Sequence, residues 1–65
     1  MERVNVVSTN IEFIEYDSDN SILKVGFTNG KSYEYKDVTQ QTFNDFKEAD
    51  SKGKFFAKHI KNKFK

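Results

Sequence analysis

Cysteine, proline and tryptophan are absent from this 65-residue chain, and histidine occurs once. Without cysteine the chain can form neither disulfides nor thiolate metal sites. No apolar run approaches the length of a membrane span, and the first residues have neither the basic start nor the apolar core of a signal peptide. We therefore expect one small domain, residues 1–65, that is cytoplasmic (in the host cytoplasm if the protein is viral) and does not engage a membrane.

Acidic side chains are missing from the C-terminal part of the chain. Residues 1–50 carry five basic and all ten acidic side chains, whereas residues 51–65 carry six lysines and no acid. Such an asymmetry of sign favours an anionic partner. The alternative is a solvated lysine face that complements the negative end of its own helix dipole.

Groups suited to catalysis or to metal binding are sparse. The sequence offers no acid pair and no Ser/His set, and His59 has no nucleophile or orienting carboxylate near it in sequence. Asp17, Asp19 and Asn20 resemble a calcium loop but lack its glycine and bidentate glutamate, so we expect an ordinary turn there. We expect no enzyme, no metal and no cofactor.

Hydrophobic patterning predicts strands in the N-terminal half. Residues 11–17 are rich in Ile, Phe and Tyr, and residues 22–28 place Leu, Val and Phe alternately on one face. Residues 31–36 form a third predicted strand, and residues 4–7 a short edge strand. The predicted arrangement is a three- to four-stranded antiparallel β meander.

The period then changes to that of a helix. Thr39 is a plausible N-cap for a helix over about residues 40–49, and Val38 and Phe43 stand where a hydrophobic staple would lie. A second helix is predicted over about residues 54–63. Its apolar stripe consists of Phe56, Ile60 and Phe64. The expected fold class is α+β, with two short C-terminal helices after the meander.

The Asn-Gly pair at positions 29–30 predicts a hairpin whose register is open. A two-residue loop pairs Gly26 with Tyr33 and turns Tyr33 and Tyr35 away from the core as an exposed platform. A three-residue loop with a bulge pairs Val25 with Tyr33 instead, and the tyrosines join the core face. We slightly favour the platform, because Tyr33 would then cover the bare backbone of Gly26.

The start of the second helix carries the parts of a phosphate site. Backbone N–H groups at a helix N-terminus are unpaired and lie at the positive end of the dipole. A serine hydroxyl, a glycine and nearby lysines add to them here. The predicted phosphate-binding residues are Ser51, Lys52, Gly53, Lys54 and Lys58. The alternative is an ordinary interhelical turn with a serine cap.

Aromatic side chains supply candidates for stacking a base. Tyr33 and Tyr35, with Tyr16 from the first predicted strand and Phe55 from the second helix, are the predicted stacking residues. Aromatic rings on a sheet commonly hold single bases. A stacking surface beside a phosphate site would suit a nucleotide. The alternative is that these rings pack in a core or an interface.

Several of these motifs together resemble the KTSC domain, a family found at the C-terminus of some lysyl-tRNA synthetases and as stand-alone bacterial and phage-type proteins. The similar segments are Val7-Ser8-Thr9-Asn10, Tyr16-Asp17, Phe27-x-Asn29-Gly30, Tyr33-Glu34-Tyr35 and Ala49-x-Ser51-x-Gly53-x-x-Phe56 followed by Ile60. Two positions depart, with Glu15 in place of a usual glycine and Thr39 in place of a usual Val-Pro. The resemblance implies a small α+β domain with a suggested role in RNA binding.

The expected function is binding of a compact anion. Six lysines would grip a long nucleic acid only modestly, and the acidic part of the chain would repel it. By analogy with small phage proteins that sequester nucleotide immune signals, we expect a homo-oligomer, a dimer or tetramer, that binds a small nucleotide without catalysis. A cyclic dinucleotide or a cyclic ADP-ribose-type signal would fit such a sponge, used in immune evasion. The alternatives are an RNA-binding module and a structural or protein-interaction subunit.

Overall fold

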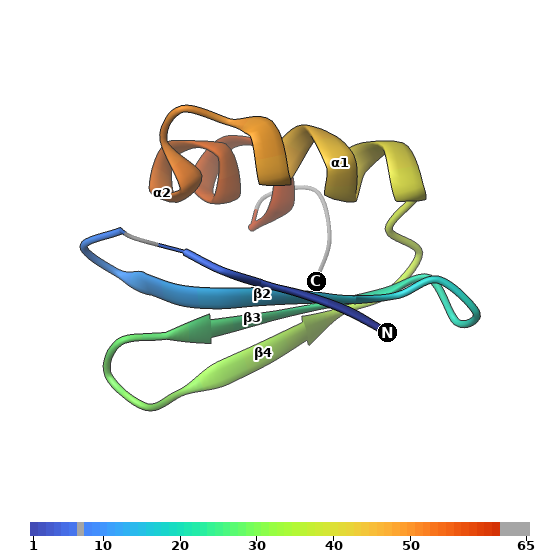
Figure 1. Ribbon diagram of the computed structural model, residues 1–65, viewed down its shortest axis with the longest axis horizontal. Helices are drawn as coiled ribbons and strands as arrows, with labels where there is room; N and C mark the ends of the chain where they lie inside the picture. The colour runs from blue at the N-terminus through green and yellow to red at the C-terminus, as the bar shows by residue number, and fades with distance from the viewer. Residues whose placement is uncertain (7, 62–65) are drawn as a thin grey trace.

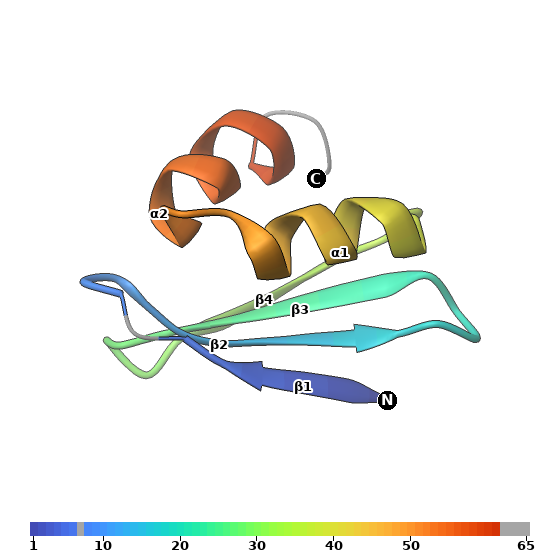
Figure 2. The same ribbon diagram turned by 45° about the horizontal axis from the view of Figure 1, so that its top comes forward.

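The computed structural model describes residues 1–6 and 8–61 as a four-stranded antiparallel sheet covered on one face by helices (Figures 1 and 2). The strands lie in chain order, β1-β2-β3-β4. The elements are β1 (Glu2–Asn5), β2 (Ile11–Asp17), β3 (Ile22–Phe27), β4 (Ser32–Tyr35), α1 (Gln40–Glu48), α2 (Lys52–Phe55) and the π-helical turn η1 (Phe56–Ile60). The predicted α+β class and the β meander followed by C-terminal helices are confirmed. No helix in the described part of the chain is long and apolar enough to cross a bilayer.

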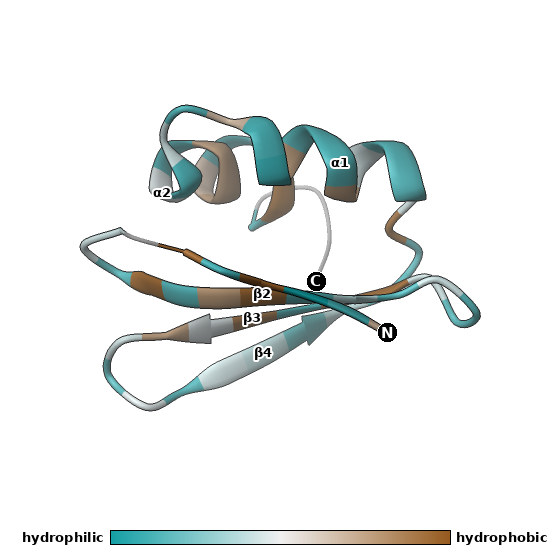
Figure 3. Cartoon of the chain, in the orientation of Figure 1, coloured by the Kyte–Doolittle hydropathy of each residue, from teal (hydrophilic) through white to brown (hydrophobic). Residues whose placement is uncertain are grey.

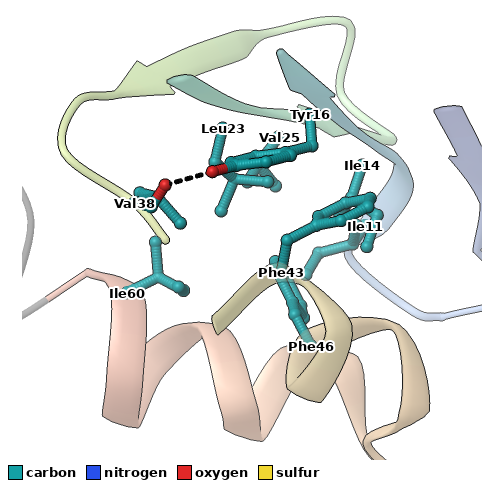
Figure 4. Packing of buried hydrophobic residues seen from close by; sticks show 9 residues of the cluster. All are labelled: Ile11, Ile14, Tyr16, Leu23, Val25, Val38, Phe43, Phe46 and Ile60. Atoms are coloured by element: carbon teal, nitrogen blue, oxygen red, sulfur yellow. Dashed lines mark hydrogen bonds between the residues drawn. The ribbon is translucent and has the colours of Figure 1, made fainter. Parts of the chain in front are cut away.

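The core lies between the sheet and the helices. Hydrophobic residues recur along the strands and on the sheet-facing turns of the helices, as Figure 3 shows. Nine side chains are at most 3% exposed, and Figure 4 shows them as one cluster. They are Ile11, Ile14, Tyr16, Leu23, Val25, Val38, Phe43, Phe46 and Ile60. The period-2 pattern of β2 and β3 and the helical spacing of Phe43 and Phe46 therefore face the same interior.

The start of α1 is the predicted one. Thr39 has an extended backbone, and its hydroxyl accepts a hydrogen bond from the Thr42 N–H at 3.2 Å. This satisfies one of the unpaired donors of the first turn. Val38 and Phe43, the expected staple positions, are both fully buried in the core cluster. Thr39, which stands in place of the Val-Pro usual in the KTSC domain, therefore still caps the helix.

The C-terminal helix differs from the prediction. It begins at Lys52, with Ser51 as N-cap, and from Phe56 it continues as a π-turn closed by the Lys61 N–H and the Phe56 carbonyl oxygen at 2.8 Å. Periodicity alone does not distinguish this turn from an α-helix. The predicted end of the helix and Phe64 of its apolar stripe lie outside the described residues.

The hairpin between β3 and β4 has the register of the three-residue loop with a bulge. Val25 pairs with Tyr33, the Phe27 N–H donates to the Lys31 carbonyl at 2.8 Å, and the Gly30 N–H donates to the Phe27 carbonyl at 3.1 Å. Gly30 has φ +88°, which a three-residue loop with a bulge requires. The predicted tyrosine platform on the outer face is therefore wrong.

The structure explains the glycine at position 26 differently from the sequence-based expectation. A Cβ atom at Gly26 would lie 2.0 Å from a ring carbon of Phe13, its partner in β2. The ring of Phe13, not that of Tyr33, covers this backbone. The Phe13 ring lies on the sheet face that points away from the helices, because the next residue, Ile14, points into the core.

Candidate functional site

A cleft lined by aromatic side chains opens where the β3–β4 hairpin meets the C-terminal helix. It has a volume of about 410 Å3. Its lining consists of Phe27, Asn29, Tyr33, Tyr35, Phe56 and Lys61. Tyr33 is 50% exposed, and only Met1 is a more exposed large hydrophobic residue in the described part of the chain. The cleft thus offers an accessible aromatic surface beside one cationic side chain.

The four rings of the cleft form a continuous chain of edge-to-face contacts. Phe27 contacts Tyr33 with ring centroids 5.7 Å apart and Phe56 at 5.3 Å. Phe56 in turn contacts Tyr35 at 5.7 Å. The interplanar angles are between 68° and 75°, which is a favourable geometry for aromatic pairs. Because each ring holds the next, the cleft is formed before any ligand enters, which lowers the entropic cost of binding.

The exposure of Tyr33 follows from the architecture. Tyr33 and Tyr35 point to the helix side of the sheet, since they pair with Val25 and Leu23 of the core. β4 is an edge strand of the described sheet, and η1 contacts it through the rings of Phe56 and Tyr35. Tyr35 is therefore half-buried, whereas Tyr33, one step closer to the hairpin loop, stays open.

The pKa of the Tyr35 phenol reflects this partial burial. Burial raises the pKa of Tyr35 above its usual value of 10.0, and the charge of a neighbouring Tyr33 phenolate raises it further. The Tyr35 hydroxyl is therefore neutral at physiological pH and can donate and accept hydrogen bonds at the rim of the cleft.

Asn29 and Lys61 provide the polar groups of the cleft. The Asn29 Oδ1 accepts a hydrogen bond from the Lys31 N–H at 3.0 Å, which fixes the amide, while its Nδ2 donates to no group in residues 1–6 and 8–61. Lys61 follows Phe56 by one π-turn. In an α-helix, a residue five positions on would lie about 140° further around the axis. The wider turn instead brings Lys61 back towards the side occupied by Phe56.

A second cavity of about 390 Å3 adjoins the aromatic cleft. The two share Phe27, Asn29, Phe56 and Lys61. The residues that belong to the second cavity alone are Asn10, Ile11, Thr28, Gly53 and Ala57. Among the described residues that line the two cavities, Lys61 is cationic and none is acidic, so both favour a neutral or anionic ligand.

The predicted phosphate-binding turn is engaged in local structure. The Ser51 Oγ accepts a hydrogen bond from the Lys54 N–H at 3.3 Å, and the Lys52 Nζ donates to the Ala49 carbonyl at 2.6 Å. Ser51 is thus a helix cap, and Lys52 satisfies a carbonyl just beyond the end of α1. The alternative of an interhelical turn with a serine cap describes this geometry, and the phosphate-binding role stays a prediction.

The five predicted phosphate residues do not gather around one cavity. Gly53 lines the second cavity beside the aromatic cleft. Ser51 and Lys52 line a separate cavity of about 530 Å3 next to β1. Lys54 and Lys58 are exposed and line neither cavity beside the hairpin. Among the described residues, the lysine that the structure places at the aromatic cleft is Lys61, which sequence reasoning did not single out.

Two of the predicted stacking residues lie outside the aromatic cleft. Tyr16 is 3% exposed, stacks on Phe43 with centroids 5.0 Å apart, and donates its hydroxyl hydrogen to the Val38 carbonyl (Figure 4). No base can reach its ring. Phe55 stacks on Phe46 of α1 at 5.1 Å and does not line the cleft. Both rings pack apolar surface, which is the alternative that the sequence left open for them.

The remaining polar candidates have structural roles. The Asp17 carboxylate accepts hydrogen bonds from the Asn20 side chain at 2.8 Å and from the Asp19 and Asn20 N–H groups, so the predicted turn is confirmed. These bonds, chiefly that from the Asn20 side chain, lower the pKa of Asp17. The ring of His59 lies 4.6 Å from that of Phe55. No three His, Asp or Glu side chains cluster as metal ligands within residues 1–6 and 8–61.

Comparison with known proteins identifies related sequences and a related structure. A family model described as the KTSC domain matches residues 7–64. An uncharacterized protein of Stutzerimonas stutzeri is 36% identical over 56 residues, covering 86% of this chain and 79% of its own. A protein of Tsukamurella paurometabola is 37% identical over 60 residues, covering 92% and 90%. The crystal structure of a KTSC domain protein from Yersinia pestis matches with a TM-score of 0.92 at 39% identity, covering 98% of this chain and 90% of that chain.

Proposed function

The chain belongs to the KTSC domain family, and we propose that it binds a small nucleotide, without catalysis, in the aromatic cleft. The observation that carries this proposal is the position of Tyr33. Its ring is half exposed, held by an edge contact with Phe27, and shares the cleft with the cationic Lys61. A ligand with a flat ring and an anionic substituent would match this combination of an exposed aromatic ring and a cation.

Each part of the site has a role in the proposal. A base stacks on the exposed ring of Tyr33, a contact worth about 1–3 kcal/mol per base. The Asn29 amide donates a hydrogen bond to an acceptor on the base edge, and the Lys61 ammonium attracts the phosphate. In this proposal the anion contact comes from the end of the C-terminal helix instead of from the Ser51–Lys54 turn.

The biological setting is a proposal of its own. We propose a cytoplasmic homo-oligomer that sequesters a nucleotide signal, such as a cyclic dinucleotide or a cyclic ADP-ribose-type molecule, as a phage sponge against host defence. The support is the small size of the domain and the analogy between small sequestering proteins. Native mass spectrometry with such ligands tests it. A defined dimer or tetramer that takes up whole numbers of nucleotides is expected, and a monomer without uptake contradicts the sponge.

RNA binding is the second candidate. It is supported by the lysine-rich segment 51–65 and by the two adjoining cavities along the hairpin, which a single strand could follow. The two candidates differ in length dependence. An RNA module gains affinity with oligonucleotide length and loses it steeply with salt, whereas a small-nucleotide site saturates with a compact ligand.

Calorimetric titration of the full chain with the four ribonucleoside monophosphates tests the proposal. Tyr33→Ala should weaken binding about 5- to 150-fold, the equivalent of one lost stacking contact. Tyr33→Phe is the matched control and should bind within about 2-fold of the unmodified chain, since it keeps the ring. Equal binding by the Ala variant, or no binding of nucleotides by the unmodified chain, would overturn the proposal.

A further inference from the structure

We infer that the preferred ligand carries two ring systems joined through an anionic group, as a dinucleotide does. This inference rests on the proposed function and extends it to the second cavity beside the aromatic cleft. One ring lies on Tyr33, the second lies in the cavity bordered by Asn10 and Gly53, and the phosphate that links them lies at Lys61.

The two cavities are matched in size and separated by one aromatic pair. Their volumes are about 410 and 390 Å3, each near the lower end of the range of about 300–1,000 Å3 for small-molecule sites. Phe27 and Phe56 line both, with ring centroids 5.3 Å apart. The pair therefore forms a ridge with space on either side. A ligand with one ring would leave half of this preformed groove empty.

Lys61 stands where the linker of such a ligand would pass. It lines both cavities, and the π-turn that ends with its N–H brings it towards the side of Phe56. Since none of the described lining residues is acidic, the Lys61 ammonium gives the groove a positive charge. A phosphodiester placed between two rings would meet this charge at the middle of the ligand, not at one end.

The second cavity also has the chemistry to hold a ring. Phe27 and Phe56 give it an apolar wall, and Asn10 and Thr28 give it polar groups. The backbone of this rim is fixed, because the Thr28 N–H donates to the Asn10 carbonyl at 2.9 Å. An apolar wall with an amide at its edge suits the face and the edge of a base.

Gly53 offers a way to block the second cavity alone. A Cβ atom added to Gly53 meets nothing within 4 Å, and its backbone does not need a positive φ. Gly53→Leu should therefore fold and fill the space with its side chain. Gly53→Ala is the matched control, since it tests the loss of glycine while leaving most of the space open.

The experiment compares AMP with the linear dinucleotide ApA and with cyclic di-AMP by calorimetric titration. The unmodified chain and Gly53→Ala should bind at least one dinucleotide about 10-fold or more tighter than AMP. Gly53→Leu should lose that advantage while keeping AMP affinity within about 2-fold. Tyr33→Ala should weaken the binding of AMP and of the dinucleotides. Circular dichroism and thermal unfolding of each variant confirm that it is folded.

The outcomes separate this inference from the proposed function. If AMP binds and neither dinucleotide binds tighter, or if Gly53→Leu keeps the full dinucleotide advantage, the second cavity is not used and the inference fails alone. If no nucleotide binds the unmodified chain, the proposed function fails and the inference falls with it. Loss of AMP binding in folded Gly53→Leu would also contradict the division into two compartments.

Discussion

The ring of Phe13 lies flat against the backbone of Gly26 in the neighbouring strand, on the sheet face away from the helices. A side chain on Gly26 would meet that ring at 2.0 Å. The Arg3 guanidinium carbon lies 4.0 Å from the centre of the same ring, so Phe13 is held between β1 and β3. This stack joins three strands on a face that otherwise presents mostly polar side chains.

Gly26→Ala should therefore destabilise the fold by displacing the Phe13 ring. We expect a loss of about 1–3 kcal/mol in the free energy of unfolding, as for other overpacked sites, measured by urea denaturation. The control is a double-mutant cycle with Phe13→Ala. In the Phe13→Ala background, Gly26→Ala should cost little, because no ring remains to be displaced. An equal cost in both backgrounds would contradict the packing explanation.

Tyr16→Phe should lower stability through one hydrogen bond. The buried Tyr16 hydroxyl donates to the Val38 carbonyl just before α1, and its removal leaves that acceptor unpaired at a cost of about 1–3 kcal/mol. Chemical denaturation of the variant measures this. Tyr33→Phe is the control, because the Tyr33 ring is half exposed and its hydroxyl makes no such bond within residues 1–6 and 8–61, and it should leave the midpoint nearly unchanged.

Charge reversal distinguishes the two candidate anion sites. Reasoning from the sequence places the anion at the Ser51–Lys54 turn, and predicts that Lys54→Glu abolishes binding. The proposed cleft predicts the reverse, with Lys61→Glu weakening nucleotide binding 10-fold or more and Lys54→Glu changing it little. Both variants alter net charge equally, so each is the other's control in the same titration. A larger loss of nucleotide affinity in Lys54→Glu than in Lys61→Glu would support an anion site at the Ser51–Lys54 turn instead.

Stability should fall at alkaline pH through Tyr35. Its pKa is raised from 10.0, first by burial and then by Tyr33, so the folded state prefers the neutral phenol more than the unfolded state does. The contribution is fully present below about pH 10 and is lost as the pH rises through the raised folded-state value. Near-UV titration of phenolate absorbance should show a late-ionising component that is lost in the Tyr35→Phe variant.

The local elements could be predicted from the sequence because their signals are local. Alternation in β2 and β3, the N-cap at Thr39 and the helical spacing of Phe43 and Phe46 each depend on near neighbours. The hairpin register could not be predicted so well. The Asn-Gly pair fits either loop, and the register that forms places Tyr35 against Phe56 of the C-terminal helix, a contact between distant parts of the chain.

The candidate site depended on the same long-range information. Tyr33 and Tyr35 were predicted as ligand-binding residues and do line the cleft, but from the helix side of the sheet. Lys61 was one lysine among six in the segment 51–65. Within the described residues, the π-turn, a backbone geometry with no clear sequence signal, brings Lys61 towards the side of Phe56.

The meander has a consequence for how the chain reaches its native state. Each strand pairs with the next one along the chain, so most of the sheet closes through short loops and the contact order is low. Mixed domains of this kind fold faster than proteins dominated by distant pairings. The chain also has no proline, so no prolyl isomerisation can add a slow phase. Refolding in a stopped-flow instrument should follow one fast exponential, even though the aromatic cleft is completed only when the last helix docks.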